Sequence, residues 1–428
     1  MKLLSVKKVI DNENVSLVGS VQDGKNGAGM EVFFRYPKRF ASFVADEGDA
    51  FVPALLLPSM AAGQDLEIIP VISEQLFNNL NTIQDTMCQW YPDLAKKVKI
   101  SARSKKEYDK NPNTNVGCFF SLGVDSFYSL YKDIHNLYFN RPPISYLIYI
   151  KGLEAPLSAY RDHQEREVVS NILDVAGRTK KDVIIGETNI RDCFPLPWGG
   201  YYSGAGIASV GLSLGAGMKS VLIPAGHSYK EIHAYSTTPL VDPLWSTERT
   251  AIVHDGAETD RAVKIADFLA KEPLAMKYLR VCLKNNGGAY NCGKCGKCVR
   301  TMISLYISGN LAHADTFPKT ISRKFDLKIC EPSEVYFGEE SLKLAKKYNA
   351  DKWLAKSIAW QINMFKMKAI LKDVSFFEAQ RLVIIFYANL FKGNLLRSAK
   401  IIPAPVRNIL KKILGINKKN TRTNPPAT

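Results

Sequence analysis

The sequence predicts an α/β protein whose core is a doubly wound, mostly parallel β-sheet. Between residues 116 and about 310, short apolar runs rich in β-branched residues alternate with longer segments of helical composition. This alternation is typical of βαβ units, which place successive strands side by side in parallel. The expected strands cover 116–120, 144–150, 182–185 and 221–224, and the expected helices begin near 127 and cover 160–176 and 204–218.

Three of the expected strands run into glycine-containing segments, which are Ser-Leu-Gly-Val-Asp-Ser at 121–126, Lys151-Gly152 and Gly226-His227. In an open α/β sheet, ligands bind outside the carboxyl ends of the strands. We therefore expect the three segments to lie on one edge of the sheet. Lys151, Gly152 and Gly226 would then line the same site as residues 121–126, which we call the 121–126 loop.

The rest of the chain is organised around this unit. Residues 1–100 predict a small α+β domain, with strands at 15–21, 30–35 and 66–71 and helices at 51–62 and 74–90. A polar linker at 101–115 leads into the α/β domain at 116–310. Residues 311–416 then predict a helical region, and the polar, proline-containing residues 417–428 predict a disordered tail.

The positive charge is unevenly distributed. The formal net charge is +16, and ten Lys and Arg residues but no acidic residue follow Ala379. A basic balance suits anionic partners in general, but its concentration in the tail argues against nucleic acid. Residues 401–416 predict either a basic amphipathic helix at a membrane surface or a helix docked on the protein with a solvated basic face.

The N-terminal residues lack the apolar stretch of a secretory signal. No run approaches the roughly 18 apolar residues that cross a bilayer. We therefore expect a cytoplasmic protein, in which eight cysteines do not indicate a disulfide framework. The sequence leaves the oligomeric state open, and a homo-oligomer is compatible with it.

Four clustered cysteines give the strongest signal in the chain, with the spacing C-x9-C-x2-C-x2-C: Cys282, Cys292, Cys295 and Cys298. Thiolates two residues apart can bind one ion, and four of them complete a closed, structural zinc site. An iron–sulfur cluster is the alternative, because C-x2-C-x2-C also occurs in ferredoxins. The cysteine and proline that follow this run in ferredoxins are missing after Cys298, so we expect zinc.

The 121–126 loop suits an anion. A strand that turns through a short loop into a helix leaves backbone N–H groups that favour phosphate. Ser121 and Ser126 add hydroxyl groups, and Asp125 could cap the helix, orient the loop or help to hold Mg²⁺. The alternative is an ordinary turn in which Ser and Asp only cap the helix.

The loop resembles the S-G-G-x-D-S loop of the PP-loop ATP pyrophosphatases, with Leu122 where that family has Gly. Together with the cysteine spacing, residues 115–305 resemble a divergent zinc-containing 7-cyano-7-deazaguanine (preQ0) synthase. The resemblance implies a fold like that of the adenine nucleotide alpha hydrolases (HUP-like). It also implies that ATP and Mg²⁺ are held by Ser121, Gly123, Asp125 and Ser126, and zinc by the four cysteines.

The segment 226–247 is polar, contains His and Tyr, and has no helical or alternating period. Long loops of this kind in compact domains are usually functional or disordered. We interpret it as a substrate-side loop, with His227, Glu231 and Asp242 as candidate substrate contacts. Arg191, after the strand at 182–185, is a candidate catalytic clamp for a phosphate or carboxylate, and a surface salt bridge is its alternative.

These observations favour an ATP-dependent ligase. The resemblance implies that a small-molecule carboxylate or amide is adenylated with release of pyrophosphate. We expect Asp125, from the resemblance, and Arg191, from its position after a strand, to be the catalytic residues. One alternative is an RNA-modifying enzyme of the tRNA-thiolation type. Another is a degenerate ATP-binding protein, in which the side chain of Leu122 narrows the approach of the pyrophosphate.

Overall fold

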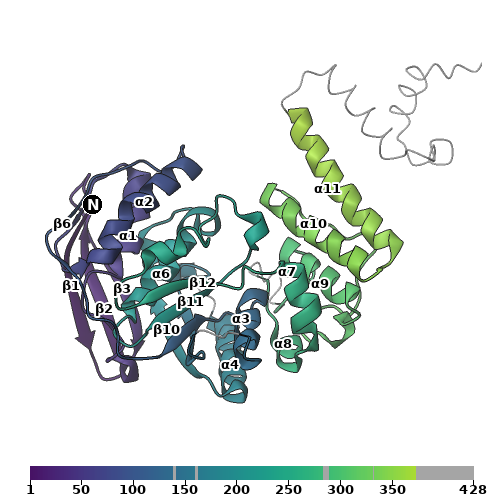
Figure 1. Ribbon diagram of the computed structural model, residues 1–428, viewed down its shortest axis with the longest axis horizontal. Helices are drawn as coiled ribbons and strands as arrows, with labels where there is room; N and C mark the ends of the chain where they lie inside the picture. The colour runs from purple at the N-terminus through teal and green to yellow at the C-terminus, as the bar shows by residue number, and fades with distance from the viewer. Residues whose placement is uncertain (138–140, 160–161, 283–288, 331, 373–428) are drawn as a thin grey trace, which may run out of the picture.

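The computed structural model describes residues 1–137, 141–159, 162–282, 289–330 and 332–372 (Figure 1). The predictions for residues 401–416, as a membrane-surface or docked helix, and for the tail at 417–428 fall outside the described residues. None of the helices among the described residues combines the length and the apolar character needed to cross a membrane.

A ten-stranded sheet, in the order β12-β11-β8-β9-β10-β3-β2-β1-β4-β6, forms the centre of the molecule. Its first five strands pair in parallel. Their bounds are β8 (Val116–Phe119), β9 (Tyr146–Lys151), β10 (Asp182–Thr188), β11 (Ser220–Pro224) and β12 (Ala251–Asp255). The structure confirms the prediction of an α/β protein with a mostly parallel sheet.

The parallel strands are covered on both faces, as a doubly wound arrangement requires. Alternate residues of β9 enter different cores, because successive side chains point to opposite faces. Leu147 and Tyr149 pack with α3 (Val124–Ile134) and α4 (Asp162–Thr179). Ile148 and Ile150 belong to the core that includes α1 (Phe51–Ala62) and α6 (Ser203–Ser213). Figure 1 shows these two pairs of helices on opposite sides of the strands.

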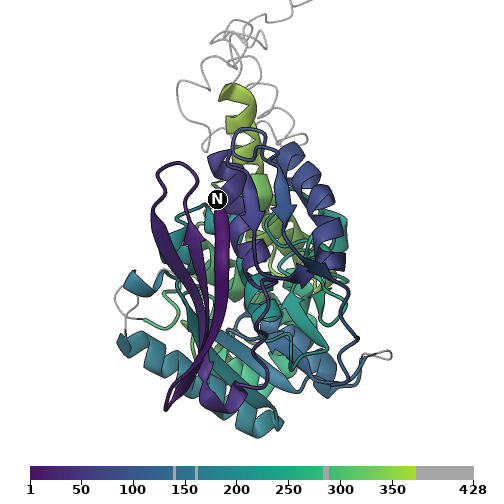
Figure 2. The ribbon, with the colours of Figure 1, turned by 90° about the vertical axis from the view of Figure 1, so that its left-hand side faces the viewer.

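The N-terminal residues extend the same sheet (Figure 2). Strand β3 pairs antiparallel with β10, so hydrogen bonds join the predicted N-terminal unit to the α/β unit. Three strands of the extension form an antiparallel meander: β1 (Lys2–Ile10), β2 (Asn14–Gln22) and β3 (Gly29–Pro37). Two short strands, β4 (Leu66–Ile68) and β6 (Ile100–Ala102), follow β1 in the sheet and run parallel to it. A separate two-stranded sheet pairs β5 (Ile72–Ser73) with β7 (Lys105–Lys106).

Local sequence explains where two of the helices begin or end. Helix α2 (Glu74–Trp90) begins after Ser73, whose Oγ accepts a hydrogen bond from the N–H of Leu76 at 3.0 Å. This is the N-cap chemistry that serine provides. Helix α6 ends at Ser213, five residues before the predicted end at 218, where a turn containing Gly215 and Gly217 follows.

Helices α10 (Pro332–Lys347) and α11 (Lys352–Lys372) lie in the region 311–416 that we expect to be helical, and they pack with α9 (Gly296–Ile307), which precedes that region. These helices share a third core with residues of α7 (Arg261–Val263). Figure 1 shows α10 lying against α7 and α9, close to the carboxyl edge of the parallel strands. The remaining α-helices among the described residues are α5 (Ile190–Cys193) and α8 (Pro273–Tyr278), and short 3-10 and π helices also occur.

Candidate functional site: a cleft at the strand ends and a four-cysteine cluster

A cleft of about 350 Å³ opens at the carboxyl ends of β8, β9 and β11. The 121–126 loop and Gly226 line it, as predicted for segments that share one sheet edge. Lys151 instead lines a separate surface depression with Glu165 and Arg166. The backbone of Gly152 has φ +97° and passes so close to β10 that an added Cβ would lie 1.9 Å from the Thr188 carbonyl oxygen. The structure therefore gives Gly152 a role in packing the strand ends.

Helix α3 begins at Val124, three residues before the predicted start near 127. Gly123 is extended (φ −78°, ψ 166°) and acts as the N-cap, so Asp125 and Ser126 belong to the first turn. The Ser126 hydroxyl donates to the Gly123 carbonyl at 3.0 Å. Gly123 has no side chain with which to cap the helix, so the first N–H groups of α3 and the helix dipole favour an anion at the cleft.

Leu122 does not narrow the cleft. Its side chain is fully buried in the core beneath α3, and its backbone has a positive φ of 63°. Its carbonyl accepts a hydrogen bond from the N–H of Arg280 at 2.8 Å. The expectation that this side chain hinders a pyrophosphate was wrong, because the left-handed backbone turns Leu122 into the core. The side chain of Leu122 therefore does not support the hypothesis of a degenerate binding protein, which stays a prediction.

Asp125 is held by two cations that the sequence reasoning did not identify. Its carboxylate lies 3.5 Å from Nη2 of Arg261 and 3.4 Å from Nζ of Lys264. Lys264 is completely buried and also donates to the Ala225 carbonyl at 2.6 Å, which ties α3 to the end of β11. Burial lowers the pKa of Lys264, and Asp125 opposes that shift. With its charge compensated in this way, Asp125 does not oppose an anion in the cleft.

Two further cations line the cleft, Arg280 and Lys297. Nη1 of Arg280 lies 2.9 and 2.7 Å from the two carboxylate oxygens of Glu154, in the loop after β9. Lys297 is exposed as a residue, but desolvation at the cleft and the neighbouring Arg261 lower the pKa of its ammonium group. In the sequence, Arg280 lies two residues before Cys282, and Lys297 lies between Cys295 and Cys298.

Arg191 reinforces the wall of the cleft. Its Nη1 donates to the backbone carbonyls of Leu153 at 3.0 Å and Glu154 at 2.6 Å. Its guanidinium also lies over the ring of Trp198, 4.8 Å from the centroid. The predicted role of Arg191 as a clamp on a ligand, and a surface salt bridge as its alternative, stay predictions. Arg191 holds the loop that carries Glu154.

The segment 226–247 is folded rather than structureless, with short 3-10 helices at Tyr229–Glu231 and Asp242–Trp245. Asp242 is fully buried, and its Oδ2 lies 2.7 Å from Nδ1 of His254 in β12. Burial raises the pKa of Asp242, and His254 opposes the shift. Asp242 therefore contacts His254 inside the protein. This contact corrects the prediction that Asp242 contacts a substrate.

His227 and Glu231 line a small recess of about 10 Å³ beside the cleft. Burial lowers the pKa of His227 to about 3, assisted by His233 and Arg261, so His227 is neutral at physiological pH. Its ring packs on Phe337 of α10, with centroids 5.0 Å apart. The C-terminal helices therefore support the segment that follows β11.

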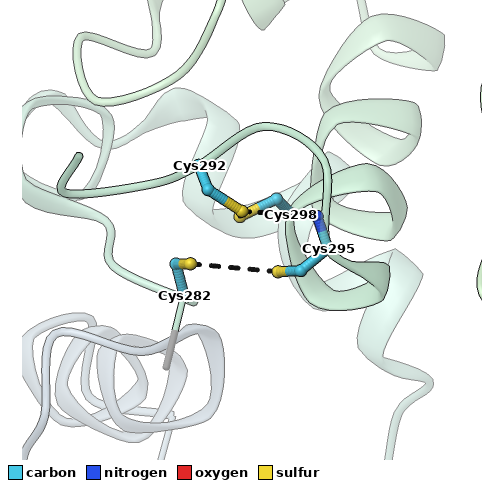
Figure 3. Close-up of side chains that lie close together, drawn as sticks. All are labelled: Cys282, Cys292, Cys295 and Cys298. Atoms are coloured by element: carbon cyan, nitrogen blue, oxygen red, sulfur yellow. Dashed lines mark hydrogen bonds between the residues drawn. The ribbon is translucent and has the colours of Figure 1, made fainter. Parts of the chain in front are cut away.

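The four cysteines converge as the spacing predicted (Figure 3). All four Sγ atoms lie within 4.8 Å of one another, and the pairs Cys292–Cys298 and Cys282–Cys295 are each 3.9 Å apart. A tetrahedral ion with Zn–S bonds of about 2.3 Å separates its sulfurs by about 3.8 Å. The cluster could therefore hold a metal such as zinc. A four-iron cluster binds each thiolate through a different iron and would spread the sulfurs farther apart.

The surrounding contacts order the cluster. The side chain of Asn291 accepts from the N–H groups of Val281 and Cys282 at 2.9 and 3.2 Å, and donates to the Leu279 carbonyl at 2.8 Å. Cys295 is the N-cap of α9, where the helix dipole favours thiolate charge. These hydrogen bonds hold the segment before Cys282 against the segment that carries Cys292, Cys295 and Cys298.

The cleft combines an uncapped helix N-terminus and several cations with an apolar wall that includes Trp198, Ile207 and Ile223. This combination suits a ligand with an anionic part and an apolar part. Comparisons with protein-family models, curated proteins and solved structures found no match.

Proposed function

We propose that the protein is an ATP-dependent ligase, resembling 7-cyano-7-deazaguanine synthases, which binds Mg·ATP at the 121–126 loop. It activates a carboxylate or amide of a small molecule by adenylation, with release of pyrophosphate. One observation carries the proposal. The uncapped first turn of α3 opens into a cleft that also presents Arg261, Arg280 and Lys297.

The reaction transfers the adenylyl group to the substrate while negative charge grows on the departing pyrophosphate. In this proposal the first-turn N–H groups of α3 and the cation Arg261, which lie at the cleft, would stabilise that charge. Asp125, whose side chain is 17% exposed, would hold Mg²⁺, which would supply positive charge beside the phosphates. Glu154, the other carboxylate that lines the cleft, is bound by Arg280.

The apolar wall of the cleft would bind the part of the substrate that does not react. Trp198 and Ile207 line the cleft beside the hydroxyl-bearing residues Ser203 and Thr237. Such a mixture of apolar surface with a few polar groups is typical of small-molecule sites. Zinc in the four-cysteine cluster is structural in this proposal, because four thiolates leave no open position for a substrate.

The proposal predicts that incubation with Mg·ATP, ammonia and a panel of carboxylic acids yields AMP and pyrophosphate with one class of acid. Asp125→Ala should lower the rate about 100-fold or more, because it disrupts preorganised charge at the phosphate site. Nucleotide products would be separated by chromatography. Asp326→Ala, at an exposed aspartate paired with Lys328, is the matched control and should retain the wild-type rate.

Asp125→Ala leaves Lys264 buried without its carboxylate partner, so the variant's folding is checked by thermal unfolding. Asp125→Asn, which keeps the shape and one acceptor oxygen, separates loss of charge from loss of packing. Release of ADP and phosphate instead of AMP and pyrophosphate would contradict cleavage between the α and β phosphates.

A further inference from the structure

The positive charge of the chain is concentrated in its last helices and in the residues that follow them. From Lys343 to Thr428 the sequence contains 18 Lys and Arg residues and three acidic residues, so this part carries 15 of the 16 net positive charges. The 342 residues before it contain 39 basic and 38 acidic residues and are almost neutral. Charge that is separated in this way indicates an anionic partner for one part of the molecule.

Part of this basic region is described by the structure, from the end of α10 through α11. Residues 343–372 contain eight lysines and one acidic residue, Asp351, which accepts a hydrogen bond from the hydroxyl of Tyr306 at 2.7 Å. Among the residues that the structure describes, Lys346, Lys352 and Lys356 have no ion-pair partner, and all three are exposed. Their charges are therefore compensated by solvent alone, which leaves them available to an anionic surface.

Helix α11 has one buried face and one exposed, basic face. The buried face consists of residues that recur every fourth position and pack in the third core: Leu354, Ile358 and Ile362. Lys352, Lys356 and Trp360 have the same spacing but are offset by two residues, which corresponds to about 200° around the helix. These three residues therefore form a line on the opposite face of α11, and all of them are exposed.

Exposed aromatic residues accompany the lysines. Trp360 is 51% exposed, while the other four tryptophans of the chain, which are also described, are buried or partly buried. Tyr348, in the turn between α10 and α11, is 39% exposed. Trp and Tyr are enriched where proteins meet the headgroups of a membrane, and nearby Lys residues are attracted to anionic lipids. The combination fits a lipid surface better than it fits a small anion.

The sequence after α11 has both properties as well. Residues 382–391 are mostly apolar, and residues 401–416 mix aliphatic residues with Arg407, Lys411 and Lys412. A surface that binds single-stranded nucleic acid combines basic residues with aromatic ones and does not require aliphatic runs. A membrane-surface segment requires basic and aliphatic residues together. The composition therefore favours lipid over nucleic acid.

The exposed face of α11 lies on the outside of the molecule. Helix α10 contacts α7 and α9, and α11 packs on α10. Figure 1 accordingly shows α10 between α11 and α7, so α11 is the outermost of these helices. Its exposed face can approach a flat surface without displacing the sheet.

We propose that the exposed face of α11, together with the basic and aliphatic residues after 372, binds the surface of an anionic lipid bilayer. Helix α11 would lie along the bilayer, with Trp360 among the headgroups and Lys352 and Lys356 beside lipid phosphates. The proposal is independent of the ligase function, because binding to lipid is measured without nucleotide.

The test is co-sedimentation of the full chain with vesicles of phosphatidylcholine alone or mixed with phosphatidylglycerol. The protein should sediment with the mixed vesicles, much less with the neutral ones, and less at high salt, which screens the attraction. Changing Lys352→Gln and Lys356→Gln together should weaken binding to the mixed vesicles about tenfold, because two basic residues near the surface are lost. Binding should also shift the tryptophan emission to shorter wavelength, and Trp360→Phe should lose this shift.

The matched control is Lys25→Gln together with Lys99→Gln, which removes the same charge from exposed lysines in the N-terminal extension of the sheet. This control should bind the mixed vesicles like the wild type. An equal loss in both double variants, or no loss in the variant of α11, would overturn the proposed surface. An emission shift that persists in Trp360→Phe, or no binding of the wild type to mixed vesicles, would overturn it as well.

A parallel titration with RNA separates the two classes of anionic partner. The proposal predicts that the wild type prefers mixed vesicles to RNA at the same salt concentration. Binding of RNA that weakens in the Lys352→Gln and Lys356→Gln variant, without binding to vesicles, would contradict the lipid surface and assign this face of α11 to nucleic acid.

Discussion

Cys298→Ser is expected to abolish stoichiometric metal binding and to weaken ATP binding about tenfold or more. Removing one of four thiolates leaves a tetrahedral ion incompletely bound. A hydrogen bond connects the four-cysteine cluster to the cleft: the N–H of Arg280, two residues before Cys282, donates to the Leu122 carbonyl at 2.8 Å. Loss of the ion should therefore release the segment that fixes the 121–126 loop.

A second connection runs through α9. Lys297 lies between the ligands Cys295 and Cys298 and lines the cleft. The ion would thus hold two cations, Arg280 and Lys297, in place at the cleft. We expect metal removal to weaken binding of ATP more than binding of adenosine. The two cations would contact the charged triphosphate, which adenosine lacks.

Metal content by mass spectrometry, thermal unfolding and ATP titration together measure this effect. Cys330→Ser, at an exposed cysteine outside the cluster, is the matched control and should keep both metal and ATP affinity. A Cys298→Ser protein that loses the metal, remains folded and still binds ATP like the wild type would show that the cluster and the cleft are independent.

Gly152→Ala should lower the free energy of unfolding by about 3 kcal/mol. An alanine there must adopt a φ of +97°, and its Cβ would lie 1.9 Å from the carbonyl oxygen of Thr188. That oxygen belongs to buried backbone at the end of β10 and cannot move aside cheaply. The strand ends that carry the cleft would have to separate.

Urea denaturation measures this difference. Gly177→Ala is the matched control, because Gly177 lies on the exposed side of α4 and an added Cβ meets nothing within 4 Å. Alanine in a helix is favoured over glycine, so this control should gain up to about 1 kcal/mol. Equal stability of Gly152→Ala and the wild type would mean that β9 and β10 do not approach as closely as described.

The sequence was informative wherever local chemistry determines structure. Helices α1 and α2 have the bounds that apolar spacing and turn residues predicted, 51–62 and 74–90. The cysteine spacing predicted the cluster, because two C-x2-C turns can bring thiolates together only in a compact loop. The 121–126 loop also lies at a strand end, where periodicity placed it.

Contacts between distant segments could not be predicted in the same way. Strand β12 is five residues long and contains His254 and Asp255, so its composition did not predict a strand. Because β12 was missed, Arg261 and Lys264 were not recognised as residues that follow a strand and reach Asp125. Leu122 was misinterpreted because its side-chain direction depends on a left-handed backbone that the residue type does not favour.

The most direct test of the proposed chemistry is exchange of labelled pyrophosphate into ATP, measured with the full, metal-loaded chain and pools of carboxylic acids. Reversible adenylation predicts that label enters ATP only when a suitable acid is present, and that the exchange disappears in Asp125→Ala. Hydrolysis of ATP to ADP and phosphate, with no exchange in any pool, would contradict the account.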